Sequence, residues 1–291
     1  MKEKRPACAI TMVKDDYFFL ELWVGHYARF FGRDALYVVS HGGDPRVAEI
    51  ASGCNVIALP PVFNESFDAV RWRLLQNLAN GLRGYYEFII CGDVDEYVVV
   101  DPKTGLGLDD FLARRKRKIT ITPIGLEVIH RPAEEPEPVT GHVIGPRRHC
   151  RFSTAYSKPC IFNRPTDLSR GGHYATDPEL NTFRNLYLFH MRCADEGTYT
   201  QTLARRSAQM DGIASSRGGG IIGGHWKRED KRETLMDKLV RLPVTGEFDF
   251  SGHCERMHGS WGARDEHGLF GPDREICEEL AVIPERFIGI V

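Results

Sequence analysis

The first hundred residues alternate between strand-like and helix-like patterns, and this alternation constrains the fold more than any other feature of the chain. Such a rhythm is typical of βαβ units, in which parallel strands form a sheet and helices cover its faces. The segment "YEFIIC" is apolar on both faces, as an interior parallel strand is. Strands are therefore expected at 7–13, 35–40, 55–59 and 86–91, and helices at 16–32, 44–51 and 67–80.

Residues that start or stop helices fall where this pattern needs them. Gly32 and Gly81 are suited to ending the first and third helices, Pro45 to the first turn of the second, and Ser66 to capping the third. The third helix also carries an apolar stripe, formed by Phe67, Val70, Leu74, Leu75 and Leu78.

After residue 100 the rhythm loosens, but no clean linker divides the chain. The whole sequence of 291 residues is therefore expected to form one α/β domain, with a mixed, mostly parallel sheet flanked by helices. The later elements predicted are helices at 108–118, 195–210 and 227–242, strands at 119–122, 125–129, 158–164 and 184–192, and a glycine-rich loop at 211–224.

Composition excludes some classes of protein. Hydrophobic residues make up 42% of the chain and charged residues 27%, as in an ordinary globular protein. The net charge of −2 argues against a nucleic acid as the main partner. The eight cysteines form no C-x-x-C pair and are expected to be free thiols in a reducing compartment. The apolar run near the N-terminus is too short for a signal peptide or a membrane span, so a cytoplasmic location is expected.

Three acids follow the fourth predicted strand, in "GDVDEY": Asp93, Asp95 and Glu96. Aspartates at i and i+2 of a regular strand point to opposite faces, so they share a ligand only if the chain turns, as Gly92 would allow. Ligands of open α/β sheets bind beyond the carboxyl ends of strands. Clustered carboxylates suit Mg²⁺ or Mn²⁺, which take one or two of them together with substrate phosphates. Many D-x-D sequences are nevertheless only helix caps or solvated turns.

The segment 76–100, containing this motif, resembles the central block of family-2-like glycosyltransferases with the GT-A fold. "VKDDYFFLELWVGHYARFFG" is similar to the opening block of that family, and "YSKPCIFNR", "GGHY" and "LFHMR" look like its later blocks. The resemblance covers most of residues 8–195 and implies a GT-A-like fold, with a nucleotide-binding half at 1–100, an acceptor-binding half at 101–225 and a C-terminal helical extension at 226–291.

The resemblance also implies roles for individual residues. Asp95 would ligate a metal, His190 would be a further ligand, and Asp93 would hold the ribose or a metal-bound water. Asp15 and Asp16 would lie against the base; they replace the family's asparagine and glutamate, which leaves the choice of base open, with a UDP-sugar expected. Lys158 or Arg192 would add positive charge at the diphosphate.

Enzymes of the resembled family carry their general base after the D-x-D block, so the resemblance implies Asp177 or Asp195 as the base for the acceptor hydroxyl. Asp195 is equally suited to capping the helix that follows it, and Asp177 to shaping the turn before Pro178. Other residues considered are Glu127 and Asp44 as remoter bases, His173 as a replacement ligand or acceptor contact, and Glu96 as a structural acceptor of backbone N–H groups.

The predicted function is therefore a metal-dependent, inverting glycosyltransferase that moves a sugar from a nucleotide diphosphate sugar to a carbohydrate or lipid-linked acceptor. The glycine-rich loop 211–224 would be a lid or a plain connector, and "RRKRK" with the helix after His225 would contact an anionic membrane or remain solvated. Two alternatives stay open: another nucleotide-metal enzyme, such as a nucleotidyltransferase, and a non-catalytic carbohydrate-binding module.

Overall fold

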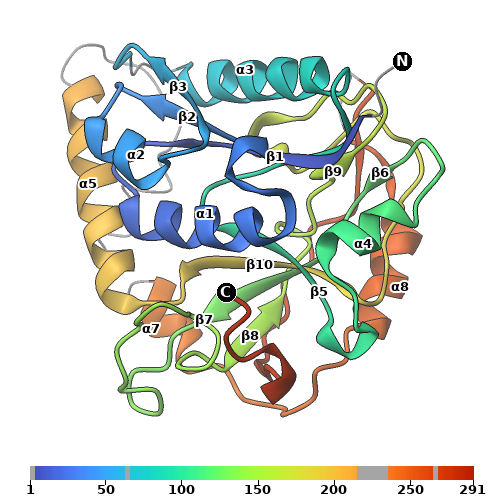
Figure 1. Ribbon diagram of the computed structural model, residues 1–291. Helices are drawn as coiled ribbons and strands as arrows, with labels where there is room; N and C mark the ends of the chain where they lie inside the picture. The colour runs from blue at the N-terminus through green and yellow to red at the C-terminus, as the bar shows by residue number, and fades with distance from the viewer. Residues whose placement is uncertain (1–3, 63–65, 215–234, 265–267) are drawn as a thin grey trace.

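The computed structural model describes residues 4–62, 66–214, 235–264 and 268–291, with the backbone alone for 206–214. Four parallel strands begin the first sheet, in the order β3, β2, β1, β4 (Figure 1). Two short strands extend it beyond β4, where β9 runs antiparallel to β4 and to β6. The bounds of these strands are β1 Arg5–Val13, β2 Leu36–His41, β3 Asn55–Leu59, β4 Tyr86–Cys91, β6 Thr120–Ile121 and β9 Ile161–Phe162.

The helices of this half alternate with the strands as predicted, with α1 at Tyr17–Phe31, α2 at Pro45–Ile50 and α3 at Phe67–Leu82. Gly32 ends α1 with a φ of 79° and donates its N–H to Ala28, and Pro45 occupies the first turn of α2. Ser66 precedes α3, but its side chain makes no capping hydrogen bond, and α3 continues through Gly81.

The apolar stripe predicted for α3 is wrong at one position. Val70 is 47% exposed, whereas Trp72, which was not assigned to the stripe, is 2% exposed. The large indole therefore takes the place in the core that the pattern gave to valine, and it brings the neighbouring Arg71 to the edge of the sheet.

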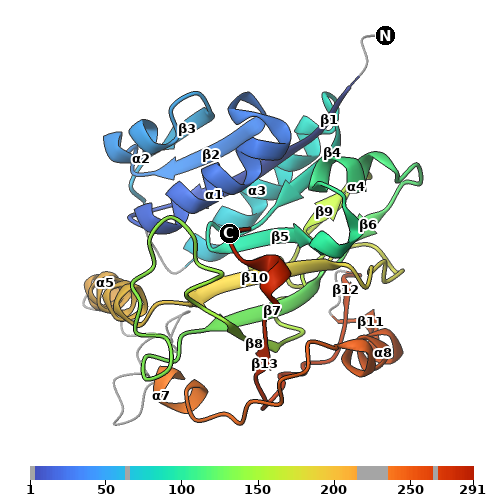
Figure 2. The ribbon, with the colours of Figure 1, turned by 60° about the horizontal axis from the view of Figure 1, so that its bottom comes forward.

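A second sheet of five strands lies beneath the first, in the order β13, β8, β7, β10, β5 (Figure 2). Of its pairings, only β7 with β10 is parallel. The predicted α/β fold, with mixed strand directions and flanking helices, is confirmed; because the chain leaves the first sheet after β4, its strands form two mixed sheets. The bounds are β5 Glu96–Val100, β7 Ile124–Ile129, β8 His149–Phe152, β10 Leu186–Cys193 and β13 Ala281–Val282.

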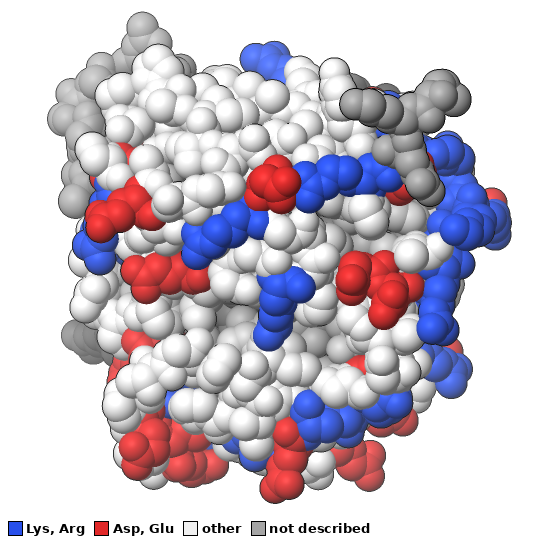
Figure 3. All heavy atoms as spheres, viewed as in Figure 1, with Lys and Arg blue, Asp and Glu red and all other residues white. Residues whose placement is uncertain are grey.

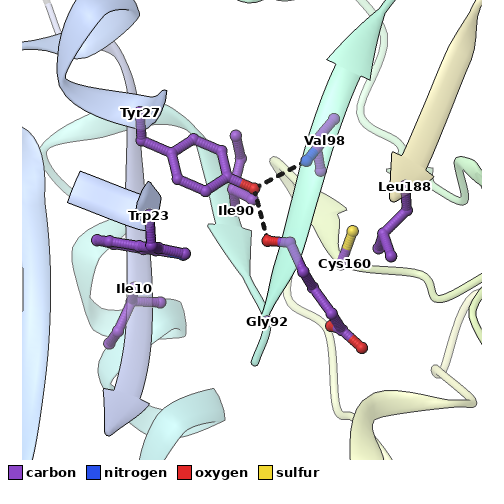
Figure 4. A pocket seen from close by; sticks show the side chains of 9 residues that line it. Ile10, Trp23, Tyr27, Ile90, Gly92, Val98, Cys160 and Leu188 are labelled. Carbon is purple, nitrogen blue, oxygen red and sulfur yellow. Dashed lines mark hydrogen bonds between the residues drawn. The ribbon is translucent and has the colours of Figure 1, made fainter. Parts of the chain in front are cut away.

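Helix α1 joins the two sheets. The hydroxyl of Tyr97, on β5, donates to the backbone oxygen of Phe19 at 3.0 Å. The N–H of Val98 donates to the hydroxyl of Tyr27 at 3.0 Å, and Nε2 of His26 donates to the oxygen of Val98 at 2.8 Å. The Tyr27 hydroxyl also donates to the backbone oxygen of Glu96 at 3.4 Å, and Figure 4 shows this hydroxyl beside Val98, at a small cavity. The start of β5, directly after the acidic motif, is thus fixed against the first sheet.

The remaining elements surround these sheets. The predicted helix at 108–118 is α4, Leu108–Ala113, and ends before the basic run; α5, Glu196–Ala214, continues four residues beyond its predicted end, into the segment expected to be a loop. The C-terminal part supplies α7 (Leu235–Leu239), α8 (Ser251–Ser260), β11 (Gly262–Ala263) and β12 (Phe270–Gly271), besides β13. Short 3₁₀ turns occur at η1 Arg33–Ala35, η2 Pro102–Thr104, η3 Arg170–Gly172 and η5 Glu285–Phe287.

Several predictions are settled or remain open at this level. All eight cysteines are free thiols, as expected. Among the described helices, none is long and apolar enough to cross a membrane. Residues 215–224 of the predicted lid and 227–234 of the following helix lie outside the described residues. The division into a nucleotide-binding half, an acceptor-binding half and a C-terminal extension stays a prediction.

Candidate functional site

The acids singled out in the sequence lie at the point where the strand order of the first sheet reverses, between β1 and β4. From β1 the chain continues to β2 and β3 on one side, and β4 pairs with β1 on the other. Asp15 and Asp16 follow β1, and Asp93 follows β4, so both groups lie just beyond the carboxyl ends of these neighbouring strands, at the switch point of the sheet. In open α/β sheets this switch point is where ligands bind.

The motif turns sharply, as predicted from Gly92. The N–H of Gly92 still donates to Ile10 of β1, at 3.3 Å, and the N–H of Glu96 folds back to the oxygen of Asp93 at 3.2 Å. The Glu96 carboxylate accepts the backbone N–H of Asp93 at 3.2 Å, which is the structural role expected for it. The turn therefore ends one strand in the first sheet and starts another in the second.

Two cations lie against this turn. Arg71, on α3, pairs with one oxygen of Asp93 at 2.7 Å, and Lys158 pairs with the other at 3.0 Å. Lys158 also lies 2.5 Å from Glu96, and its side chain is only 4% exposed. Lys158 was predicted for the site. Arg71 was missed, although its place beside a buried tryptophan on the helix before β4 is a signal that could have indicated it.

Burial and pairing together determine the charges of this cluster. Burial acts to raise the pKa of Asp93, but Lys158 and Arg71 hold it well below its usual range. Burial raises the pKa of Glu96 to about 7, with Asp93 and Asp95 adding to the effect and Lys158 opposing it. Burial acts to lower the pKa of Lys158, but Glu96 and Asp93 outweigh it and raise that pKa. Asp93, Arg71 and Lys158 are therefore ionised at neutral pH, while Glu96 titrates near it.

Asp95 faces the other sheet. Its carboxylate lies 3.5 Å from Nε2 of His190, on β10, and its backbone oxygen accepts the N–H of Met191 at 2.9 Å. Burial lowers the pKa of His190 to about 3, so the imidazole is neutral. Its Nδ1 is buried and has no hydrogen-bond partner in the described part of the chain. A neutral imidazole and a carboxylate side by side can both act as ligands of one divalent cation.

A buried network holds the His190 ring. Tyr156 stacks on it with ring centroids 3.8 Å apart, and the Tyr156 hydroxyl donates to Glu127 at 3.1 Å. Glu127 in turn accepts two hydrogen bonds from Arg151, at 2.8 and 2.6 Å. Glu127, considered as a remote base, therefore has a positioning role in this arrangement, since its carboxylate is already paired.

The residues fit a divalent cation in part. Within residues 4–62, 66–214, 235–264 and 268–291, no group of three or more His, Cys, Asp and Glu side chains is arranged to hold a metal. Asp93 is engaged by two cations, which leaves Asp95 and His190 as the donor pair of the predicted set. Two protein ligands suffice for Mg²⁺ or Mn²⁺ when substrate phosphates and water supply the rest.

Asp15 and Asp16 lie on the β1 side of the switch point. Asp15 has a φ of 59°, a left-handed conformation that is costly for a residue with a side chain and is often found at functional sites. Arg205, on α5, donates to the backbone oxygen of Asp15 and to the Asp16 carboxylate, the latter at 2.9 Å. Asp44 caps α2 and accepts the Tyr17 hydroxyl, so its carboxylate is also engaged.

The two predicted bases have structural partners. Asp177 is 3% exposed and accepts the N–H groups of Thr120 and Glu179, at 3.1 and 3.2 Å, and so shapes the turn across Pro178. Asp195 accepts the N–H of Thr198 at 2.8 Å at the start of α5 and pairs with Arg147 at 3.3 Å. These are the turn and cap roles weighed against catalysis; a catalytic role for either stays a prediction.

The remaining candidates, Arg192 and His173, each contact a different segment of the chain. Arg192 lies over the ring of Tyr199, on α5, at 5.4 Å. His173 follows η3, and its Nδ1 lies 2.9 Å from the backbone oxygen of Ala155, in the segment that leads to Lys158. His173 is therefore anchored beside the segment that carries the cationic side of the site.

The fold and site define an α/β protein with mixed sheets and a cluster of charged residues at the switch point of the first sheet. No protein-family model matches the chain, and no curated protein matches it in sequence. One solved structure that matches is that of mannose-1-phosphate geranyltransferase from Thermus thermophilus, at 15% identity and a TM-score of 0.29. The match covers 77% of this chain and 68% of that one. A likeness this distant carries neither substrate nor reaction over to this chain.

Proposed function

We propose that this protein is a glycosyltransferase that moves a sugar from a nucleotide diphosphate sugar, a UDP-sugar, to an acceptor hydroxyl with inversion. One observation carries the proposal: the switch point of the first sheet has carboxylates after both β1 and β4 and, beside Asp93, two cations held in fixed positions. The base of a nucleotide sugar offers hydrogen-bond donors, which match the carboxylates after β1. Its diphosphate is negatively charged, which matches the two cations beside Asp93.

Each residue then has a defined task in the proposal. Asp15 and Asp16 accept hydrogen bonds from the base, and Asp93 accepts them from the ribose. Lys158 and Arg71 place positive charge where the diphosphate gains negative charge as it leaves. Glu96 keeps Lys158 in position through their contact at 2.5 Å.

Asp95 and His190 are the residues that would hold a divalent cation. Mn²⁺ or Mg²⁺ bound there would stabilise the departing diphosphate as a Lewis acid. His190 is suited to this because burial keeps its imidazole neutral, and Tyr156 holds the ring in place.

The test is to incubate the protein with a panel of nucleotide sugars, Mn²⁺ and candidate acceptors, and to measure the products released. Release of a nucleoside diphosphate with a glycosylated acceptor is expected. Release of pyrophosphate from a nucleoside triphosphate and a sugar 1-phosphate would identify a nucleotidyltransferase instead. No turnover of any donor, together with sugar binding, would favour the carbohydrate-binding module.

A matched pair of variants tests the residues. Asp95→Asn is expected to lose most of the Mn²⁺-dependent turnover, since the amide is a poor ligand of the same shape. Asp273→Asn, in an exposed ion pair with Arg264, is the control and should keep the turnover of the wild type. Full metal dependence in Asp95→Asn would exclude Asp95 as a ligand.

The basic run after α4 supports a second element of the proposal, contact with an anionic membrane that carries a lipid-linked acceptor. Lys and Arg gather at the right edge of the molecule, over α4 and the segment before β6 (Figure 3). Arg114, Lys116, Arg117 and Lys118 are exposed. Arg115 instead packs over Phe111, at 3.3 Å from its ring centroid. Clusters of this size bind anionic lipid surfaces through charge.

Vesicle sedimentation tests this contact. Vesicles with anionic lipid are expected to bind the protein at low salt and release it at high salt, whereas neutral vesicles should not bind it. Replacing Arg114, Lys116 and Lys118 with serine should abolish binding. Equal binding to neutral and anionic vesicles would contradict an electrostatic contact.

A further inference from the structure

His173 has its two ring nitrogens in different surroundings. Its Nδ1 lies 2.9 Å from the backbone oxygen of Ala155. Because a carbonyl oxygen only accepts hydrogen bonds, Nδ1 carries the proton. Nε2 then has its lone pair available, and it makes no hydrogen bond within the described part of the chain. The fold therefore presents this imidazole as a proton acceptor.

Two glycines place the ring. Gly171 and Gly172 have φ values of 76° and 67°, which favour glycine. A Cβ at Gly171 would come within 2.6 Å of Nε2, so the imidazole packs closely against this glycine and a side chain there would displace the ring. A Cβ at Gly172 would come within 2.6 Å of Trp72, so this turn lies directly on the indole.

The same turn lies close to the two residues whose cations pair with Asp93, Arg71 and Lys158. Trp72 is the neighbour of Arg71 on α3, and Nζ of Lys158 lies 5.7 Å from the Trp72 ring centroid. The segment from Ala155 to Lys158 supplies both the carbonyl that fixes His173 and the ammonium that pairs with Asp93. His173 is thus held from two directions, by the turn that lies on Trp72 and by the segment that carries Lys158.

The charges around His173 are those of the site. Burial lowers its pKa to about 4, and the positive charges of Lys158 and Arg274 act in the same direction, while Asp93 opposes them. The imidazole is therefore neutral at pH 7. An anionic diphosphate beside Lys158 and Arg71 would offset their charge and raise the pKa of His173, so the ring becomes a stronger base when the donor is bound.

We propose that Nε2 of His173 accepts the proton of the acceptor hydroxyl, which makes His173 the general base of the proposed transfer. This inference rests on the function proposed above. The hydroxyl oxygen forms a bond to the anomeric carbon, and the bond from that carbon to the diphosphate breaks, with its electron pair leaving on the diphosphate. The hydroxyl proton passes to Nε2, and the imidazolium returns it to water after the product leaves.

The test uses His173→Asn, whose amide can still donate to the oxygen of Ala155 but has no basic nitrogen. Turnover should fall by about 10²- to 10⁴-fold, the range for loss of a general base. Binding of UDP and Mn²⁺ should stay close to that of the wild type. His253→Asn is the control, because His253, on α8, is a half-buried histidine paired with Glu275 and should leave turnover unchanged.

Two further measurements keep the proposal open to refutation. The acidic limb of the pH profile of kcat should disappear in His173→Asn, and added imidazole should restore part of the turnover in His173→Gly. Unchanged turnover in His173→Asn, or loss of UDP binding along with it, would overturn the role as base. Absence of sugar transfer by the wild type would instead refute the proposed function, and the inference with it.

Discussion

Tyr156 lies flat against His190, with an angle of 14° between the rings and 3.8 Å between their centroids. The contact fixes the orientation of the imidazole that faces Asp95. It joins two segments that are distant in sequence, the residues before β9 and strand β10, and extends through the Tyr156 hydroxyl to Glu127.

This stack should matter more to the proposed cation site than the hydroxyl of Tyr156 does. Tyr156→Leu removes the ring that orients His190 and should weaken Mn²⁺ binding by about 10- to 100-fold, as other losses of support around metal ligands do. Tyr156→Phe keeps the ring and should bind Mn²⁺ nearly as the wild type does. Titration of Mn²⁺ in the presence of UDP measures both. Equal losses in the two variants would show that the hydrogen bond to Glu127, and not the stack, supports the site.

Lys158 should contribute strongly to stability. Lys158→Met leaves Asp93 and Glu96 buried with one cation fewer, and breaking a buried pair costs about 3–5 kcal/mol of unfolding free energy. Lys103→Met is the control: Lys103 is 54% exposed and pairs with Asp101, so its loss should cost at most about 1 kcal/mol. Urea denaturation compares the two. Similar losses would mean that Lys158 is not the counter-ion of the cluster.

The turn before His173 should tolerate no side chain at Gly172. Gly172→Ala combines a left-handed φ of 67° with a contact of 2.6 Å to Trp72. Gly105→Ala is a matched control, since Gly105 has a φ of 66° but no atom within 4 Å of an added Cβ. The difference in unfolding free energy should be about 1–3 kcal/mol, the usual cost of overpacking. No difference would show that the indole moves aside freely.

Stability should fall as pH drops from 6.5 toward 4. Burial lowers the pKa values of His26 and His173 to about 4 and that of His190 to about 3, so in this window the unfolded chain binds protons that the folded chain does not. Glu96, with a pKa of about 7, acts in the opposite direction. The three histidines together bind up to three more protons in the unfolded chain, and Glu96 binds up to one more in the folded chain, so the net difference is two protons. The unfolding free energy therefore changes by at most about 2.7 kcal/mol per pH unit, at about 1.36 kcal/mol for each proton.

Denaturation at several pH values checks this dependence, and His190→Gln should reduce its slope by about half. A stability that is constant or rises on acidification to pH 5 would contradict the neutral, buried state assigned to these histidines.

The sequence by itself determined the order of elements in the first half and the position of the acids. Strands β1 to β4 and helices α1 to α3 follow from local apolar periodicity and from residues such as Gly32 and Pro45 at the ends of helices. The acids lie at the carboxyl end of β4 because the apolar run ends there. These features depend on neighbours along the chain, and a pattern in one segment is enough to predict them.

Only the tertiary structure decided which distant residues meet. "EYVVV" suits either sheet, since it is apolar on both faces. Its pairing with β10 places it in the second sheet, and the hydrogen bond from the N–H of Val98 to the Tyr27 hydroxyl holds it against α1. Arg71 reaches Asp93 because Trp72, not Val70, enters the core. Asp177 and Asp195 acquire structural partners from residues as far away as Thr120 and Arg147. Such contacts arise from packing between elements, about which periodicity along one segment says nothing.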